Sequence, residues 1–220
     1  MLEKITVGMI STNCYIIRVG VDGAVVIDPG DDAPLIVKKL EELRLIPHYI
    51  LFTHGHYDHL AGLPGLLAHY AALNIYPKTA IHQDDAYFLG QGAYKQHCCC
   101  FAAITGGYTT FVDKLWSSEL PEPDVILQEG MVIEQFRIIH LPGHSAGSAA
   151  FYDEAGGLLI SGDTLFQNGV GRTDMPGSNG GLLKKSLAKL FELPADTKVY
   201  PGHGSSTTIG QEKDLSLLGL

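Results

Sequence analysis

The sequence has few basic side chains and no long apolar run. Its 220 residues include 15 lysine and arginine residues against 24 aspartate and glutamate residues, which gives a formal net charge of −9. A negative balance of this kind opposes general binding to nucleic-acid phosphates, so nucleic acid is not an expected partner. No apolar stretch reaches the roughly 18 residues that a bilayer-spanning helix needs, so a membrane is not an expected partner either.

Cysteine is also scarce, and its spacing does not suit a disulfide framework. Of the four cysteines, Cys14 lies in an apolar strand pattern and is expected to be a small core residue. Cys98, Cys99 and Cys100 are consecutive and too close together for ordinary structural disulfides. The Met-Leu-Glu-Lys start lacks the basic and then apolar pattern of an export signal. We therefore expect a cytoplasmic protein.

The length and the 45% hydrophobic content predict one substantial core, and hence a single domain over residues 1–220. Residues 83–120 mix glycine, aromatic residues and the cysteine triplet without a clean period. We expect this stretch to be an irregular, partly helical excursion beside the active site.

Short apolar runs and helical stripes alternate along the rest of the chain, which predicts an α/β protein. Asp32 is expected to cap a helix whose apolar stripe includes Leu35, Ile36 and Leu40. The other expected helices cover residues 60–73, 181–191 and 208–218. Strands are expected at 5–10, 13–19, 24–28, 47–52, 74–76 and up to 82. A second sheet is expected to contain 125–127, 131–134, 136–141, 148–153, 157–161 and 198–200.

The most informative stretch is Thr-His-Gly-His-Tyr-Asp-His at residues 53–59, which directly follows an expected buried strand. Neutral imidazole and carboxylate oxygen are ligands that divalent transition metals prefer. His54 and His56 alternate like strand residues and can point to one side, while Asp58 and His59 follow the bend. Gly55 is expected to let the backbone approach the metal closely.

Three later strand ends have the same character. His144 in Leu-Pro-Gly-His-Ser, Asp163 in Ser-Gly-Asp-Thr and His203 in Tyr-Pro-Gly-His-Gly each follow an apolar strand and neighbour a glycine. Strand ends from two sheets can meet at one edge of a layered α/β protein. We therefore expect two metal ions and divide the ligands between them. His54, His56 and His144 are assigned to one ion, Asp58, His59 and His203 to the other, and Asp163 to a bridging position.

Such a centre predicts hydrolysis. Two divalent ions about 3.5 Å apart generate hydroxide near neutral pH and polarise a carbonyl oxygen, so no serine or cysteine nucleophile is needed. The expected nucleophile is a metal-bridging hydroxide, and Asp58 is expected to orient it. His and Asp ligands suit zinc, which we expect, but also iron and manganese.

Several nearby residues favour simpler interpretations. The hydroxyls of Thr53, Thr164 and Ser145 lie near the ligands in sequence, yet such residues at strand ends commonly satisfy local backbone groups. Asp28 is interpreted first as a turn residue and left outside the catalytic set. The histidines not assigned to metal are His48, His69, His82, His97 and His140, of which His82 and His97 are expected at the surface or in a pocket.

Taken in order, the four motifs resemble those of the metallo-β-lactamase superfamily over nearly the whole chain. The resemblance implies a four-layer αββα sandwich of two mixed sheets flanked by helices, with a dinuclear site at one edge. Within the superfamily, the stretches around Asp163 and His203 and the Gly-Arg-Thr-Asp sequence at residues 171–174 are similar to glyoxalase II and its short bacterial relatives. That similarity implies hydrolysis of a thioester such as S-D-lactoylglutathione, a small molecule, by a monomer or small homo-oligomer.

Alternatives from other classes stay open. Persulfide dioxygenases resemble glyoxalase II closely and use one iron, and a metal-binding module without catalysis would need the same ligands. A β-lactamase or an RNA-processing nuclease fits the sequence less well. Glyoxalase II carries basic residues for glutathione in a C-terminal region that the short relatives lack. Contacts of Arg172, Lys114 or Lys95 with an anionic substrate are therefore guesses.

Overall fold

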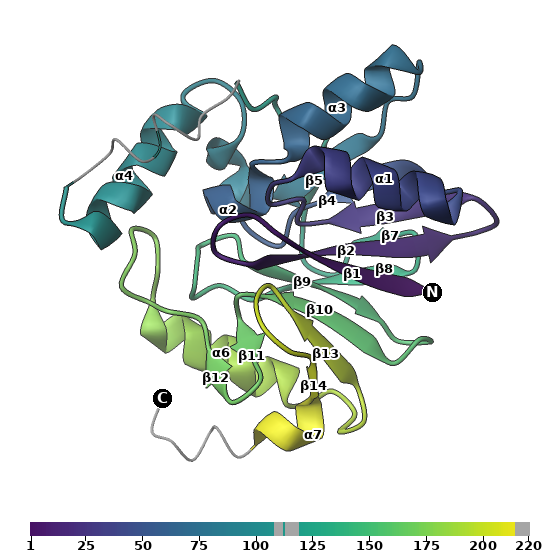
Figure 1. Ribbon diagram of the computed structural model, residues 1–220. Helices are drawn as coiled ribbons and strands as arrows, with labels where there is room; N and C mark the ends of the chain where they lie inside the picture. The colour runs from purple at the N-terminus through teal and green to yellow at the C-terminus, as the bar shows by residue number, and fades with distance from the viewer. Residues whose placement is uncertain (108–111, 113–118, 214–220) are drawn as a thin grey trace.

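Two six-stranded sheets lie face to face, and helices cover the outer face of each. The computed structural model describes residues 1–107, 112 and 119–213. The layers follow the order αββα (Figure 1), which confirms the predicted sandwich. The outer helices are α1 (Ala33–Leu43) and α3 (Leu63–Ala72) on the first sheet and α6 (Gly180–Leu190) on the second.

The first sheet begins antiparallel and continues parallel. Its strands, in spatial order, are β1 (Leu2–Val7), β2 (Thr12–Val19), β3 (Gly23–Ile27), β4 (Ile46–Leu51), β5 (Lys78–His82) and β6 (Val125–Leu127). The prediction for β6 was wrong, because we expected it in the second sheet. It pairs parallel to β5, with Ala80 opposite Val125, and so extends the first sheet at its edge.

The second sheet is antiparallel except where β10 and β13 run parallel. Its spatial order is β14 (Thr207–Thr208), β13 (Lys198–Pro201), β10 (Leu158–Gly162), β9 (Ala149–Asp153), β8 (Phe136–His140) and β7 (Val132–Ile133). The short strands β11 (Leu165–Phe166) and β12 (Gly169–Val170) form a separate pair after β10.

Alternation along the strands produces three apolar layers, one for each interface of the sandwich. In β2, Cys14 and Ile16 pack toward α1 and α3, while Tyr15 and Ile17 pack between the two sheets. A third cluster joins the second sheet to α6. The strands β2 and β3 are buried over almost their whole length, because both faces of the sheet are covered there.

Two local predictions around the helices need correction. Asp32 stands at the start of α1 but makes no side-chain cap, because its φ is 49° and its carboxylate accepts the backbone N–H of Gly8 instead. Leu35 is 45% exposed and lies outside the buried stripe of α1. The strand expected at 74–76 is a turn, in which Asn74 has a left-handed φ of 59°.

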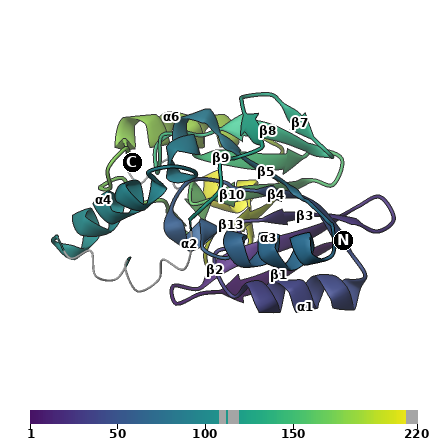
Figure 2. The same cartoon turned by 90° about the horizontal axis from the view of Figure 1, so that it is seen from above.

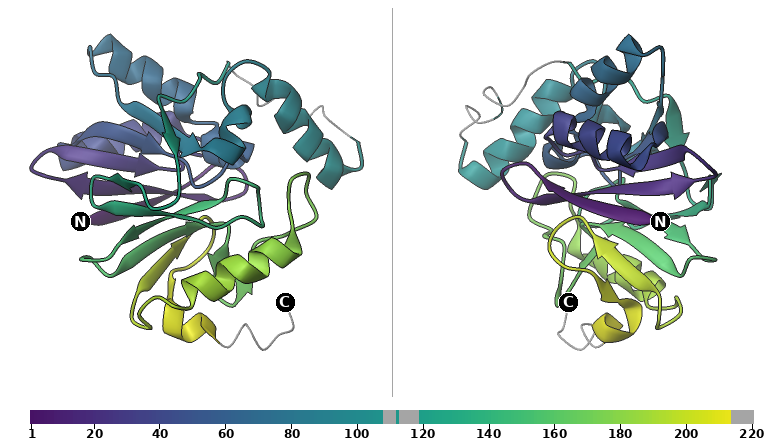
Figure 3. Two further views of the ribbon diagram at one scale, coloured as in Figure 1. Left: turned by 180° about the vertical axis from the view of Figure 1, so that it is seen from behind. Right: turned by 45° about the vertical axis from the view of Figure 1, so that its right-hand side comes forward.

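The described part of the 83–120 stretch forms the 3₁₀ helix η1 (Gln83–Phe88) and the helix α4 (Ala93–Thr105). Viewed from above and from behind, α4 projects beside the sandwich at the edge where α2 (Tyr57–Leu60) lies (Figures 2 and 3). Lys114 lies outside the described residues. The final helix α7 covers Ile209–Glu212, and residues 214–218 of its predicted span also lie outside. Within the described ranges, no helix is long and apolar enough to cross a bilayer.

Candidate metal centre

All seven predicted ligands meet at one edge of the sandwich. His54 and His56 follow β4, and Asp58 and His59 lie on the short helix α2 that comes next. From the second sheet, His144 follows β8, Asp163 follows β10 and His203 follows β13. Because β10 and β13 are parallel, their carboxyl ends deliver Asp163 and His203 to the same edge.

The side chains form two adjacent groups of three. His54, His56 and His144, here called the inner trio, offer nitrogen atoms within 4.8 Å of one another. The outer trio of Asp58, His59 and His203 meets the same limit. These are the two sets that the sequence analysis assigned to two ions.

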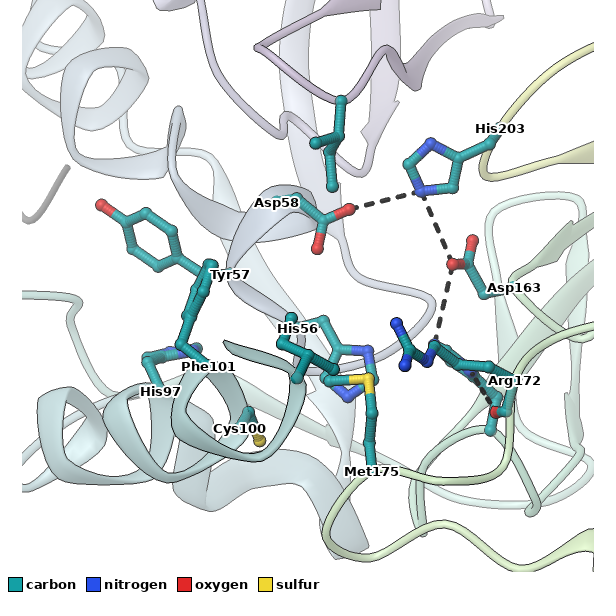
Figure 4. Close-up of a pocket in the computed structure, with 13 residues that line it drawn as sticks. His56, Tyr57, Asp58, His97, Cys100, Phe101, Asp163, Arg172, Met175 and His203 are labelled. Carbon is teal, nitrogen blue, oxygen red and sulfur yellow. Dashed lines mark hydrogen bonds and ion pairs between the residues drawn. The ribbon is translucent and has the colours of Figure 1, made fainter. Parts of the chain in front are cut away.

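Asp163 lies between the two trios. Its Oδ2 is 3.6 Å from Nε2 of His144 and 3.5 Å from Nε2 of His203, and its Oδ1 is 3.5 Å from Nε2 of His59. Figure 4 shows its carboxylate between His203 and the inner side of the site. Asp163 is thus within reach of ligands from both trios, and it also groups with His54 and His59 as possible ligands of one ion.

The inner trio has the polar atoms that a metal ion would satisfy. Nε2 of His54, His56 and His144 and Oδ1 of Asp163 are buried and have no hydrogen-bond partner within the described residues. Buried polar atoms are normally paired, since leaving one unpaired costs about 1–3 kcal/mol. Several such atoms converging on one point fit a bound cation.

In His54 and His144, a hydrogen bond at Nδ1 fixes the orientation of the ring, and with it the direction of the Nε2 lone pair. Nδ1 of His144 lies 3.0 Å from the carbonyl oxygen of Arg172, which can only accept, so Nδ1 carries the proton and Nε2 stays free. Nδ1 of His54 lies 3.1 Å from Oγ1 of Thr53. Burial lowers the pKa of His54 and His56 well below the usual value, and the neighbouring imidazoles lower it further. The rings are therefore neutral, as metal ligation requires.

Asp28 forms hydrogen bonds that hold residues of both trios in place. One oxygen accepts the backbone N–H of Thr53 at 2.8 Å. The other accepts the Thr53 hydroxyl at 2.6 Å and lies 2.9 Å from Nδ1 of His59. Because the Thr53 hydroxyl donates to Asp28, its oxygen is free to accept from His54. Sequence reasoning missed this role, although Asp28 stands at the end of β3 beside the strand that carries the first motif.

Asp85 joins the two loops of the inner trio. This fully buried carboxylate accepts the N–H of Gly55 at 2.8 Å, the hydroxyl of Ser145 at 2.6 Å and the N–H of Gly147 at 2.7 Å. Gly55 separates His54 from His56, and Ser145 follows His144. Burial raises the pKa of Asp85, and its three hydrogen bonds partly offset that effect. Asp85 lies on η1, within the stretch 83–120 that has no clean period, so nothing in the sequence indicated this role.

The start of β2 supports the outer trio. The Thr12 hydroxyl donates to Oδ2 of Asp58 at 3.1 Å. The Asn13 side chain donates to the carbonyls of Pro201 and Gly204, which flank His203, and the Tyr15 hydroxyl donates to Pro201 at 2.6 Å. These bonds tie the last ligand loop to the first sheet.

The electrostatics of the outer trio favour a cation. His59 is buried among the carboxylates of Asp28, Asp58 and Asp163. Burial lowers the pKa of His59, but the three carboxylates outweigh burial and raise it well above the usual value. Positive charge is therefore stabilised where their oxygens converge.

Comparison with known proteins agrees with this geometry. Residues 7–203 match the Metallo-beta-lactamase superfamily. The chain belongs to this superfamily. It is 34% identical over 215 residues to hydroxyacylglutathione hydrolase GloC of Haemophilus influenzae, covering 96% of this chain and 94% of that protein.

Solved structures of superfamily members superpose over nearly the whole chain. TTHA1623 in a di-iron-bound form has a TM-score of 0.76 and 36% identity, with 96% of each chain covered. The BLEG-1 B3 metallo-beta-lactamase has a TM-score of 0.79 and 33% identity, with 97% of each chain covered. The resemblance inferred from the four motifs is thus confirmed at the level of the superfamily.

The glycines of the superfamily motifs have packing roles. A Cβ on Gly55 would lie 2.0 Å from the ring of Phe88, so this glycine makes room for Phe88. A Cβ on Gly202 would lie 2.1 Å from Oδ1 of Asp163 and 2.7 Å from Cε1 of His59. Glycine before His203 therefore lets the last loop pack against two ligands.

The nearby hydroxyls divide into different roles. Thr53 and Ser145 bond to the buried carboxylates of Asp28 and Asp85, so their interpretation as purely local backbone partners was wrong. The hydroxyl of Thr164 is buried and makes no hydrogen bond within the described residues.

His82 and His140, together with Asp84, form a second cluster apart from the seven predicted ligands. His82 is only 2% exposed, so a surface position is wrong for it, and its ring stacks on that of His140 with centroids 3.9 Å apart and planes at 15°. Asp84 lies 3.8 Å from both rings. Because the lone pairs of near-parallel rings lie in separate planes, this stack suits packing better than joint ligation of one ion.

A cavity of about 210 Å³ opens directly onto the metal centre. Ligands from both trios line it, together with residues from α4, from the turn after β1 and from the loop before α6 (Figure 4). His97 on α4 lines this cavity, as expected for a pocket residue, and burial lowers its pKa to about 4. A small molecule in the cavity would touch the centre.

Proposed function

We propose that the chain is a metal-dependent hydrolase of small-molecule thioesters. The observation that carries the proposal is the pair of trios with Asp163 between them, because it brings two groups of possible cation ligands together beside an open cavity. The similarity to GloC, a hydroxyacylglutathione hydrolase, supports the thioester as the substrate class.

The donor set fits two divalent ions, with zinc as the expected metal, and the di-iron form of TTHA1623 supports the number. Such ions would lower the pKa of a shared water to near neutrality and polarise the carbonyl oxygen of the substrate. The chain itself holds the geometry: the inner trio presents neutral imidazoles, and Asp163 spans the two positions.

Asp58 has a further role in this proposal. Burial raises its pKa, but His59 and His203 outweigh burial and lower the pKa well below its usual range, so the group is ionised. Its Oδ2 accepts from Thr12 and faces His203 at 3.3 Å. A carboxylate fixed in this way can accept a hydrogen bond from the attacking water and so orient it.

The test combines metal content with three activities. The protein is purified without a metal-binding tag and analysed for zinc, iron and manganese per chain. Hydrolysis of S-D-lactoylglutathione, hydrolysis of a β-lactam and oxygen uptake with glutathione persulfide are measured on the same sample. About two ions per chain with thiol release supports the proposal. One iron with oxygen consumption would overturn it in favour of a dioxygenase, and bound metal without any of the activities would favour a binding module.

A further inference from the structure

The cavity beside the metal centre has an apolar wall built from three separate parts of the chain. Ile10 comes from the turn between β1 and β2, Phe101 and Ile104 from α4, and Met175 from the loop before α6. We call these four residues the apolar wall. Figure 4 shows Phe101 and Met175 among the labelled residues that line the cavity.

The wall exposes large apolar side chains to solvent. Ile10 is 59% exposed and Ile104 is 41% exposed, and Met9 beside Ile10 is 73% exposed. Single exposed apolar residues are common, but a group from distant segments around the mouth of one cavity is typical of a binding surface. Pockets for small molecules are lined mainly by such side chains, with a few polar groups that fix orientation.

Apart from the metal centre itself, the cavity offers little positive charge to an anionic ligand. Among the described lining residues, Arg172 is the one lysine or arginine. Its guanidinium donates to both oxygens of Asp174, at 2.6 and 2.8 Å, so its charge is already paired. Glutathione carries two carboxylates, and the described lining residues offer them no second lysine or arginine.

We infer that the substrate carries an apolar chain directly beside the thioester group and that this chain lies against the apolar wall. The inference rests on the proposed thioester hydrolysis and names its substrate class. In the reaction, hydroxide adds to the carbonyl carbon and the carbon–sulfur bond breaks to release a thiolate. The proton of the added hydroxide passes to the thiolate, so the products are a carboxylate and a thiol.

Two series of neutral thioesters test the inference. In the first, the thiol is N-acetylcysteamine and the acyl group grows from acetyl to octanoyl; in the second, the acyl group is acetyl and the thiol is an alkanethiol of growing length. We expect kcat/KM to rise about fourfold per methylene in one series, because each buried methylene adds about 0.8 kcal/mol of transfer free energy. The series that responds shows which side of the thioester meets the wall.

A matched pair of variants localises the effect. Ile104 on the wall and Ile126 on β6 are both 41% exposed, and Ile126 does not line the cavity. Ile104→Ser should lower kcat/KM for the longest substrate about threefold to tenfold, mainly through KM, and lower it by a smaller factor for the acetyl substrate, which reaches less of the wall. Ile126→Ser should change neither, and metal content should be unaltered in both.

Binding gives a readout that does not depend on turnover. The thioether S-octyl-N-acetylcysteamine cannot be hydrolysed, and calorimetry should show it binding more weakly to Ile104→Ser than to the unchanged chain. Equal rates across both series, or faster turnover of S-D-lactoylglutathione than of every apolar thioester, would overturn the inference while leaving the hydrolase standing. Absence of hydrolysis with every thioester would instead refute the proposed function.

Discussion

The inner and outer trios offer similar ligands in different surroundings. His54 and His144 are 1% and 3% exposed, whereas the side chains of Asp58 and His203 are 24% and 27% exposed. The loops of the inner trio are joined by Asp85 inside the protein, while the outer trio depends on hydrogen bonds from the start of β2. The ligands of the inner ion are thus held by buried side chains, whereas the outer ion has two partly exposed ligands.

This difference predicts unequal affinity. A preorganised site binds with less loss of conformational freedom, so the inner ion should be held more tightly and the outer ion should leave first when a chelator is added. Replacing a residue that bonds to one trio should change the chelator concentration at which one ion leaves. Replacing a residue that bonds to both trios should change it for both ions.

The largest effect is expected from removal of an inner ligand. His56→Ala should leave one ion fewer per chain. It should lower thioester hydrolysis by more than the 10–100-fold that is typical when a residue bonded to a metal ligand is removed. His48→Ala is the matched control, because His48 is half exposed and faces Glu134 away from the centre. Elemental analysis and turnover are measured on both. Full activity of His56→Ala with unchanged metal would refute the site.

Asp28→Asn tests the partner that the two trios share. The amide keeps the size of the carboxylate but loses its charge and one acceptor, so the Thr53 N–H, the Thr53 hydroxyl and Nδ1 of His59 can no longer all be bonded as they are. We expect about a 10–100-fold loss of affinity for each ion, measured by chelator titration. A change confined to one ion would show that Asp28 serves only that trio.

Asp85→Asn should weaken the inner ion alone. Both carboxylate oxygens accept hydrogen bonds, so an amide nitrogen would face a backbone N–H of Gly55 or Gly147. We expect about tenfold weaker binding of the inner ion, at the lower end of the range for residues that bond to metal-ligand loops.

Asp124→Asn is the control for the Asp85 experiment, because Asp124 also accepts from backbone and hydroxyl groups, those of Thr79, but far along the sheet from the ligands. Equal losses in the two variants would indicate a general effect of removing a carboxylate rather than a role at the inner trio.

The sequence predicted the ligands better than the residues that hold them. His54, His144, Asp163 and His203 each follow an apolar strand, and strand ends in a layered fold meet at an edge, so local pattern was enough to group them. Asp85 and Asn13 act across the fold, on segments more than 60 and 180 residues away along the chain. No local pattern marks such long-range contacts.

The same distinction explains the errors in the fold. The short apolar run identified Val125–Leu127 as a strand, but three residues do not indicate which sheet they join, and parallel pairing with β5 decides it. Asp32 has the residue type of a helix cap, yet its left-handed backbone turns the carboxylate toward Gly8. In both cases a tertiary contact determined what local preference left open.

Thr12→Val is expected to give the smallest effect and the sharpest test of the outer trio. Valine keeps the shape of threonine and removes only the hydroxyl that donates to Asp58 at 3.1 Å. One hydrogen bond to a charged group contributes about 1.5–3 kcal/mol when fully buried, and Asp58 is partly exposed, so we expect a loss of about tenfold or less for the outer ion. The inner ion should be unaffected, because Thr12 contacts none of its ligands. Thr79→Val is the control, since its buried hydroxyl donates to Asp124, far along the sheet from the ligands. If chelator titration of Thr12→Val released both ions earlier, the two positions would be coupled through Asp163, and the independence of the trios would have to be abandoned.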